Sequence, residues 1–256
     1  MNPHVRYAAI TAALMSAAIP LGTALRHRYG PAAAARFTAG MSASVIAQQS
    51  LVGLALLREG SPSGPRRRRA LSPVDAITLS RGGAAALMVG LLTSGIRDRR
   101  GRAGWLGWAT LLYGAIVSDW LDGPIARRLG TSELGATLDI EADSWLTLST
   151  SAVAVAAGGL PAYVVAPPIL RYVRLAALRR IVPYRDLVSG DPLWTRHVGM
   201  AQMMLYIAAL APFGGRLTRV LVRLGAPPVV VGQLVTLSLM SWRRLNARLR
   251  FHRESG

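Results

Sequence analysis

Residues 118–143 read SDWLDGPIARRLGTSELGATLDIEAD. It contains six of the 12 acidic residues in a chain whose formal charge is +18. Apolar sequence of helical character runs into it from one side and out of it on the other. Carboxylates at membrane depth are costly to keep, so we treat these acids as functional candidates.

The aspartates of this stretch fall into two pairs with helical spacing. Asp119 and Asp122 are three residues apart, and Asp139 and Asp143 are four apart, so each pair shares one face if its segment is helical. Four convergent carboxylates cannot all stay ionised in a low-dielectric site unless a cation joins them. An all-oxygen ligand set suits Mg²⁺ or Mn²⁺, and we therefore predict a divalent metal site.

Glycine and proline residues separate the two pairs. Gly123 and Pro124 can end or kink the first helix, and Gly135 lies one turn before Asp139, where a missing side chain lets a ligand or a backbone come close. We expect two helix ends that present their carboxylates to one another. A lone Asp-x-x-Asp is more often a solvated helix end, so the second pair and the glycines carry the prediction.

These residues resemble the signature of the CDP-alcohol phosphotransferases, integral membrane enzymes that form phospholipid head-group bonds. The matching positions are Asp119, Asp122, Gly123, Ala126, Arg127, Gly135, Asp139 and Asp143. Seven residues separate Arg127 from Gly135, which is shorter than is usual in the family. The segment 73–81 is similar to the opening of the family's first helix, and the resemblance covers about residues 72–245.

The resemblance implies a role for each matching residue. Asp119, Asp122 and Asp139 would be the principal metal ligands, and Asp143 would take the acceptor's proton while also touching the metal. The two metal-binding aspartates of the first pair would also contact the CDP donor, together with Gly123, Ala126, Arg127 and Gly135. Glu133 and Glu141 match no fixed position of the family, and we assign them to the loop and to the rear face of the helix.

The composition indicates a membrane protein. Apolar residues make up 52% of the 256 residues and charged residues 16%, with long apolar runs between them. All 30 basic residues are Arg, and they cluster between the apolar runs, which favours anionic lipid headgroups over nucleic acid as partners. The chain has no cysteine, which excludes a disulfide framework and a zinc–thiolate site.

The apolar runs predict an all-α integral membrane protein with a six-helix family-like core and an N-terminal two-helix hairpin. The expected spans are 7–25, 37–57, 77–96, 103–118, 136–157, 162–178, 200–213 and 220–240, the last interrupted at 225–228. Residues 158–161 should form a turn. We predict a hairpin over 1–60, a basic linker over 61–71 and the phosphotransferase domain over 72–256.

Several polar residues fall inside these apolar runs. Gln48 and Gln49 are expected to hydrogen-bond to a neighbouring helix rather than to a ligand. Thr78 and Arg81 lie one turn apart near the entry of their span. Arg81 can reach a phosphate or extend along the helix to the membrane surface, and of the two we favour the second.

The distribution of arginine predicts the orientation. The run 66–69 and the connection that follows residue 170 should be cytoplasmic, which places the carboxylates on the cytoplasmic face of a multi-pass protein in the cell membrane, with both ends inside. The basic loops 26–36 and 97–102 would then lie outside, against the same rule. The connection includes Arg171, Arg174 and Arg196, candidates for holding the acceptor or a phosphate.

The leading functional prediction is a membrane enzyme of phospholipid biosynthesis. It would transfer a phosphatidyl group from a CDP-linked donor, CDP-diacylglycerol, to an alcohol acceptor and release CMP, and the family resemblance also implies a homodimer. A metal or proton transporter is the first alternative, because intramembrane carboxylates also mark ion pathways. A prenyl-transferring membrane enzyme is the second. The position of the acids at helix ends beside Gly123 and Arg127 favours the transferase.

The residues at two positions near the signature allow an inference about the acceptor. Relatives that use a phosphorylated alcohol commonly carry a basic residue two places before the second signature glycine and another after the final aspartate. Here these places hold Glu133 and Ser144. A carboxylate repels an incoming phosphate, so an unphosphorylated acceptor is favoured, unless Arg171, Arg174 or Arg196 holds the phosphate instead.

Overall fold

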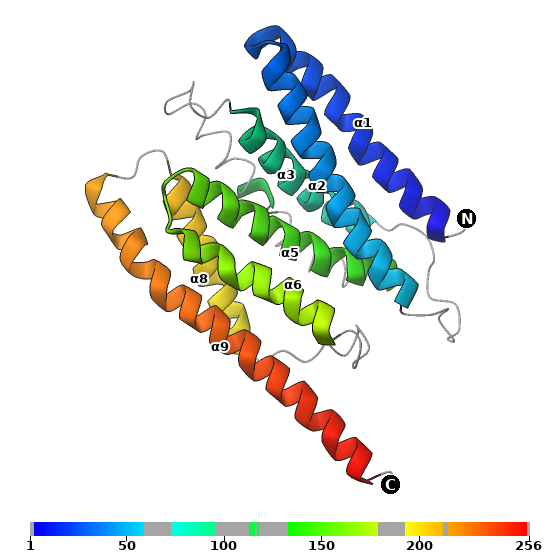
Figure 1. Cartoon of the computed structure of the whole chain (residues 1–256), viewed down its shortest axis with the longest axis vertical. Helices are drawn as coiled ribbons and strands as arrows, with labels where there is room; N and C mark the ends of the chain where they lie inside the picture. The colour runs from blue at the N-terminus through cyan, green and yellow to red at the C-terminus, as the bar shows by residue number, and fades with distance from the viewer. Residues whose placement is uncertain are drawn as a thin grey trace.

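The computed structural model of the chain describes residues 3–58, 73–95, 113–115, 117, 133–178, 193–211 and 215–254. Every regular element in these residues is helical, which confirms the predicted all-α class (Figure 1). The elements are α1 (Pro3–Tyr29), α2 (Pro31–Arg58), α3 (Pro73–Ser94), α5 (Glu133–Ala156), the 3-10 turn η2 (Ala162–Val165), α6 (Ala166–Leu178), α8 (Leu193–Leu210) and α9 (Arg216–Glu254).

Helices α1 and α2 form the predicted N-terminal hairpin. They are joined by Gly30, whose φ of +89° is a left-handed conformation that favours glycine. Its N–H donates to the carbonyl of Arg26 at 3.0 Å, and Pro31 begins the next helix, where its fixed φ and missing N–H cost nothing. Figure 1 shows the two helices running antiparallel, side by side.

The hairpin packs closely against α3, the first helix of the predicted core. A Cβ added at Gly40 of α2 would lie 2.0 Å from the hydroxyl oxygen of Thr93, and one added at Gly82 of α3 would lie 2.7 Å from the side-chain nitrogen of Gln48. Glycine at these two positions therefore allows the backbones of α2 and α3 to approach each other, as small residues do between membrane helices.

Helix α3 contributes residues to two apolar clusters. On one side Ala86 packs with Phe37, Met41 and Val45 of the hairpin. On the other side Met88 belongs to the larger cluster that joins α3, α5, α8 and α9, whose buried members include Leu146, Val153, Leu205, Tyr206 and Ala226. A change in the position of α3 would therefore disturb both clusters.

The connection after α5 forms where the glycines predicted it. Gly158 has a φ of +71°, and the N–H of Gly159 donates to the carbonyl of Ala154 at 3.0 Å, which closes the helix. The span predicted over 162–178 begins as the 3-10 turn η2 and becomes α-helical only at Ala166. Helix α6 then returns alongside α5 (Figure 1).

The predicted interruption at 225–228 is wrong, because α9 continues without a break through Pro227 and Pro228. Two adjacent prolines remove two N–H donors, and the carbonyls freed one turn earlier can be satisfied by local adjustment, which membrane helices tolerate. Figure 1 shows α9 as one long helix that extends beyond the rest of the bundle.

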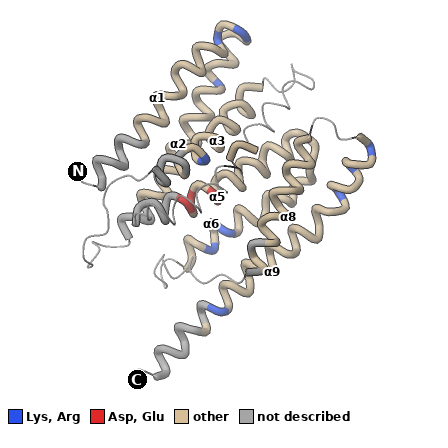
Figure 2. The backbone as a smooth tube through the Cα atoms, turned by 180° about the vertical axis from the view of Figure 1, so that it is seen from behind, with Lys and Arg blue, Asp and Glu red and all other residues tan. Residues whose placement is uncertain are grey.

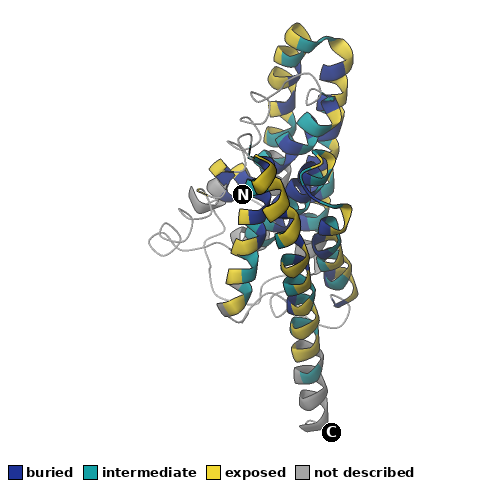
Figure 3. Ribbon diagram, turned by 90° about the vertical axis from the view of Figure 1, so that its left-hand side faces the viewer, coloured by how far each residue is buried: buried dark blue, intermediate teal, exposed yellow. Residues whose placement is uncertain are grey.

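The outer surface of α9 is apolar. Its segment Arg216–Arg243 is, among the described helices, the one long and apolar enough to cross a membrane, and α8 contains a shorter apolar helix, His197–Leu210. Leu217, Leu221, Leu224 and Val231 are all exposed along α9, as Figure 3 shows for this helix in yellow. A row of exposed aliphatic side chains is what contact with lipid chains requires. The eight-span topology otherwise stays a prediction.

Candidate active site

Helix α5 carries the second aspartate pair on one face. Asp139 and Asp143 lie one turn apart within the helix, and Gly135 lies one turn before them, as predicted. Their side chains are 47% and 43% exposed, so each carboxylate keeps an open side. Figure 2 shows the acidic residues in red on α5, close to a basic residue of a neighbouring helix.

That basic residue is Arg81 of α3, whose side chain is completely buried. Its Nη1 donates to Oδ1 of Asp143 at 2.6 Å, and its Nη2 donates to Oδ1 of Asp139. Nη2 also lies 3.4 Å from the hydroxyl oxygen of Thr78, one turn earlier on α3. The expectation that Arg81 extends to the membrane surface is therefore wrong, because its two anionic partners hold it inside the bundle.

The guanidinium joins the two carboxylates because of its shape. An Arg presents several N–H donors in a rigid planar fork, so one side chain can hold two carboxylates at once, which a point-charge ammonium does less well. A buried cation without anionic partners would cost several kcal/mol, and this cost makes the pairing specific. The exposed sides of Asp139 and Asp143 therefore face away from Arg81 and are oriented by it.

The hairpin helps to fix this arrangement. Trp145, two residues after Asp143, donates from its indole nitrogen to the hydroxyl oxygen of Ser44 on α2 at 2.7 Å. Gln48, one turn further along α2, is 4% exposed and packs against Gly82, the residue that follows Arg81. The helices that carry the ion pair are thus both supported by α2, an element that lies outside the predicted core domain.

The two glutamates that match no fixed position of the family, Glu133 and Glu141, lie elsewhere on α5 than the aspartate pair. Glu141 is completely buried on the opposite side of α5, in agreement with its assignment to the rear face. Glu133 was expected in the loop but is the first residue of α5. Ser144 is 1% exposed, and its hydroxyl donates to the carbonyl of Ile140 at 2.7 Å.

The burial of Ser144 changes the inference about the acceptor. A side chain that points into the bundle cannot contact an acceptor on the open side of Asp143. The lack of a cation at this position therefore does not bear on whether the acceptor carries a phosphate. Of the two positions, Glu133, the first residue of α5, is the one on which the prediction of an unphosphorylated acceptor now depends.

The first half of the signature lies outside the described residues. These positions are Asp119, Asp122, Gly123, Ala126 and Arg127. Among the residues that the structure does describe, no group of three or more His, Asp or Glu side chains could hold a metal ion. The convergence of all four aspartates therefore stays a prediction. Asp139 and Asp143 are suited to be two of the four predicted metal ligands, because two partly exposed carboxylates supply hard oxygen ligands.

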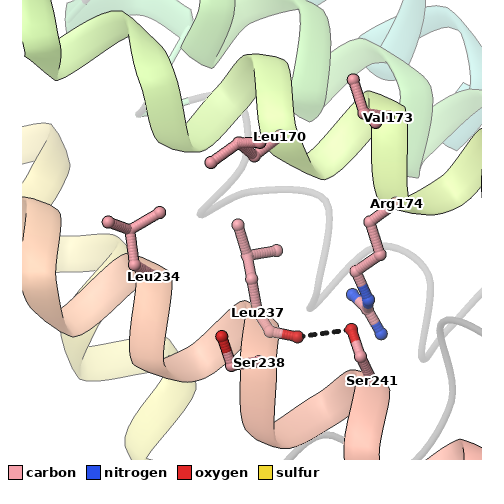
Figure 4. Close-up of a pocket in the computed structure, with 7 residues that line it drawn as sticks. All are labelled: Leu170, Val173, Arg174, Leu234, Leu237, Ser238 and Ser241. Atoms are coloured by element: carbon pink, nitrogen blue, oxygen red, sulfur yellow. Dashed lines mark hydrogen bonds between the residues drawn. The ribbon is translucent and has the colours of Figure 1, made fainter.

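The three candidate arginines are spread over two helices. Arg171 and Arg174 belong to α6, and both are partly buried, whereas Arg196 lies in the first turn of α8. Arg174 lines a pocket between α6 and α9 (Figure 4). Tyr172, between the two arginines of α6, instead faces α5, with its ring 6.2 Å from that of Trp145 in an edge-to-face contact.

Comparison with known proteins agrees with the signature. The family model described as CDP-alcohol phosphatidyltransferase matches residues 73–237, a segment that begins with α3 and includes Arg81, Asp139 and Asp143. No curated protein and no solved structure matches the chain. The matched segment extends over well over half of the sequence, and the chain therefore belongs to the CDP-alcohol phosphatidyltransferase family.

Proposed function

We propose that this protein transfers a phosphatidyl group from CDP-diacylglycerol to an alcohol acceptor at the cytoplasmic face of the cell membrane. The observation that supports this most is the pair Asp139 and Asp143, held on one face of α5 by the buried Arg81 inside the segment that matches the family. Membership makes the chain an integral membrane transferase of substituted phosphate groups, and it decides against the transporter and the prenyl-transferring enzyme.

In the proposed reaction the acceptor hydroxyl oxygen attacks the phosphorus that carries the diacylglycerol. The bond from this phosphorus to the bridging oxygen breaks, and CMP leaves with the electron pair. Asp143 is the proposed base: Oδ1 accepts from Arg81, and the carboxylate can take the hydroxyl proton on its exposed side. Arg127 and the glycines of the signature are proposed to lie against the cytidine diphosphate.

A divalent metal ion is typical of the family. In this chain Asp119, Asp122 and Asp139 would hold it, with Asp143 touching it as well, and it would offset the charge on the phosphate oxygens when bound. The chain's own contribution is orientation. Arg81 binds the Oδ1 atoms of both described aspartates and so holds the two partly exposed carboxylates on the same face of α5.

The metal assignment predicts a binding defect that needs no turnover. Asp139→Asn should weaken Mn²⁺ binding by about tenfold, since one negatively charged ligand is lost. The electron paramagnetic resonance signal of free Mn²⁺ measures this in purified protein without substrate. Glu254→Gln, at the end of α9, removes the same charge far from α5 and should leave Mn²⁺ binding unchanged. Equal affinity in Asp139→Asn and wild type would remove Asp139 from the ligand set.

The acceptor is tested by direct comparison of substrates. Purified protein is incubated with CDP-diacylglycerol, Mg²⁺ and either inositol or inositol phosphate, then either glycerol or glycerol phosphate, and CMP is assayed. We expect faster CMP release with the unphosphorylated member of each pair, because Glu133 at the start of α5 repels a phosphate. Preference for the phosphorylated member of both pairs would contradict this, and no CMP with any alcohol would contradict the proposed reaction.

A further inference from the structure

A pocket between α6 and α9 is lined by Arg174, one of the three arginines that the sequence offers as candidates for holding the acceptor or a phosphate. Its volume is about 250 Å³, and its lining residues are Leu170, Val173, Arg174, Leu234, Leu237, Ser238 and Ser241. On each helix they recur at intervals of three or four, so each helix contributes one continuous stripe. Figure 4 shows the two stripes facing each other across the groove.

The groove is polar at one end and aliphatic at the other. In Figure 4 the guanidinium of Arg174 extends from α6 toward Ser241 on α9, whereas Leu170 and Leu234 face each other at the opposite end. Ser241 and Leu234 are seven residues apart on α9, which corresponds to roughly 10 Å along the axis. The hydroxyl of Ser241 donates to the carbonyl of Leu237 at 2.7 Å (Figure 4), whereas the hydroxyl of Ser238, which is exposed, can donate to a ligand beside the guanidinium.

The polar end coincides with the end of the membrane-spanning segment. The apolar segment of α9 ends at Arg243, two residues after Ser241. Trp242, between them, is 65% exposed, and exposed tryptophans are enriched at the level of lipid headgroups. At the aliphatic end, Val173 and Leu170 are 57% and 44% exposed, so the groove opens sideways toward the surrounding lipid.

The groove lies on the side of α6 that faces away from α5. Tyr172 points toward Trp145 on α5, and Arg174 follows it by two residues, which is about 200° around the axis of α6. The side chain of Arg174 therefore lies on the α9 side of α6, with the helix itself between it and α5. A ligand in this groove would therefore be separated by α6 from α5.

We propose that this groove is a binding site for an anionic phospholipid of the surrounding bilayer, distinct from the CDP-linked donor. The phosphate would bind Arg174 and the hydroxyl of Ser238, and one acyl chain would follow Val173 and Leu237 toward Leu170 and Leu234. An anionic lipid brings a net negative charge to the cation at the headgroup level, whereas a zwitterionic lipid also brings an ammonium group, for which the lining residues offer no carboxylate. The inference requires that the helices lie in a bilayer, but it does not depend on the proposed reaction.

The absence of cysteine from the chain makes a clean test possible. Ala177→Cys places a single fluorescent label on α6, one turn beyond Arg174, at an exposed position outside the groove lining. Quenching by phosphatidylglycerol with brominated chains is compared with quenching by phosphatidylcholine with the same chains, in mixed detergent micelles. Val231→Cys, exposed on α9 outside the groove, is the matched control for general lipid contact.

We expect half-maximal quenching at Ala177→Cys at about fivefold lower phosphatidylglycerol than phosphatidylcholine, the scale of one basic residue beside an anionic lipid. The control label should show no such preference. Arg174→Gln should abolish the preference, and Arg174→Lys should retain part of it. Size-exclusion profiles and thermal midpoints establish that these variants are folded. The comparison of the two lipids in labelled protein that keeps Arg174 does not depend on these variants.

Three outcomes would overturn the proposal. Equal quenching by the two lipids at Ala177→Cys would show that the groove does not select an anionic headgroup. Quenching by phosphatidylglycerol that CDP-diacylglycerol relieves at its half-saturating concentration for CMP release would make the groove part of the donor site. Efficient oxidative cross-linking between Ala177→Cys chains would show that a second copy of the protein covers it.

Discussion

Replacing Asp143 by Asn should lower the rate of CMP release by about two or more orders of magnitude, the scale of a lost general base. The substitution preserves the size of the side chain and the oxygen that can accept from Nη1 of Arg81, an interaction of 2.6 Å in the structure. What it removes is the second carboxylate oxygen's capacity to take a proton on the exposed side. The turnover number at saturating CDP-diacylglycerol measures this.

The comparison with Asp122→Asn separates two roles for Asp143. A base that acts on the acceptor should affect turnover more than donor binding, whereas a residue that holds the metal beside the diphosphate should affect both. We therefore expect a smaller loss of CDP-donor affinity in Asp143→Asn than in Asp122→Asn, measured by titration calorimetry. An equal loss in the two variants would make Asp143 a ligand and not the base, and Glu254→Gln again serves as the charge control.

Much of the helical framework follows directly from the sequence. The apolar runs 7–25 and 37–57 predicted α1 and α2, and Gly30 with Pro31 marks their turn. The spacing of Asp139 and Asp143 predicted that they share a face, and their common partner Arg81 confirms it. These features are local, since periodicity and turn chemistry depend on residues close in the chain.

The features that the sequence did not predict are long-range. Arg81 is one of 30 arginines, and an Arg near a span entry usually extends to the membrane surface. Its burial depends on α5 bringing two carboxylates to α3 and on Gly82 allowing Gln48 to pack beside it. The aspartates of α5 and Gln48 of α2 cannot be identified as neighbours of Arg81 from the segment around residue 81 alone, because they lie tens of residues away in the chain.

The packing of the N-terminal hairpin against α3 is a second long-range feature that the sequence did not predict. Composition places a basic linker at 61–71 and predicts a separate unit before it. The described helices nonetheless share an apolar cluster across this boundary, with Ala86 of α3 packed against Phe37 and Met41. Ser44 reaches further, to Trp145 beside the aspartates. We propose that the hairpin, although it precedes the segment that matches the family, supports the active site.

Replacing Arg81 should lower both the stability and the activity of the protein. Arg81→Gln leaves Asp139 and Asp143 without the cation that holds both, and breaking a buried ion pair typically costs 3–5 kcal/mol. Because both aspartates are nearly half exposed, water can replace part of the interaction, and we expect a loss of about 2 kcal/mol in the free energy of unfolding. CMP release should fall by about a hundredfold, because the base and a metal ligand lose their orientation.

A positioning role is distinguished from a purely structural one by rescue and by metal binding. Arg81→Lys keeps the charge but lacks the planar fork, so it should recover most of the stability and only part of the Mn²⁺ affinity and CMP release. Arg219→Gln, at an exposed position on α9, is the matched control and should resemble wild type. In a double-mutant cycle, Arg81→Gln and Asp139→Asn should be non-additive in unfolding free energy, since they remove the same interaction. Additive losses, or wild-type Mn²⁺ binding and CMP release in folded Arg81→Gln, would show that Arg81 does not orient these carboxylates.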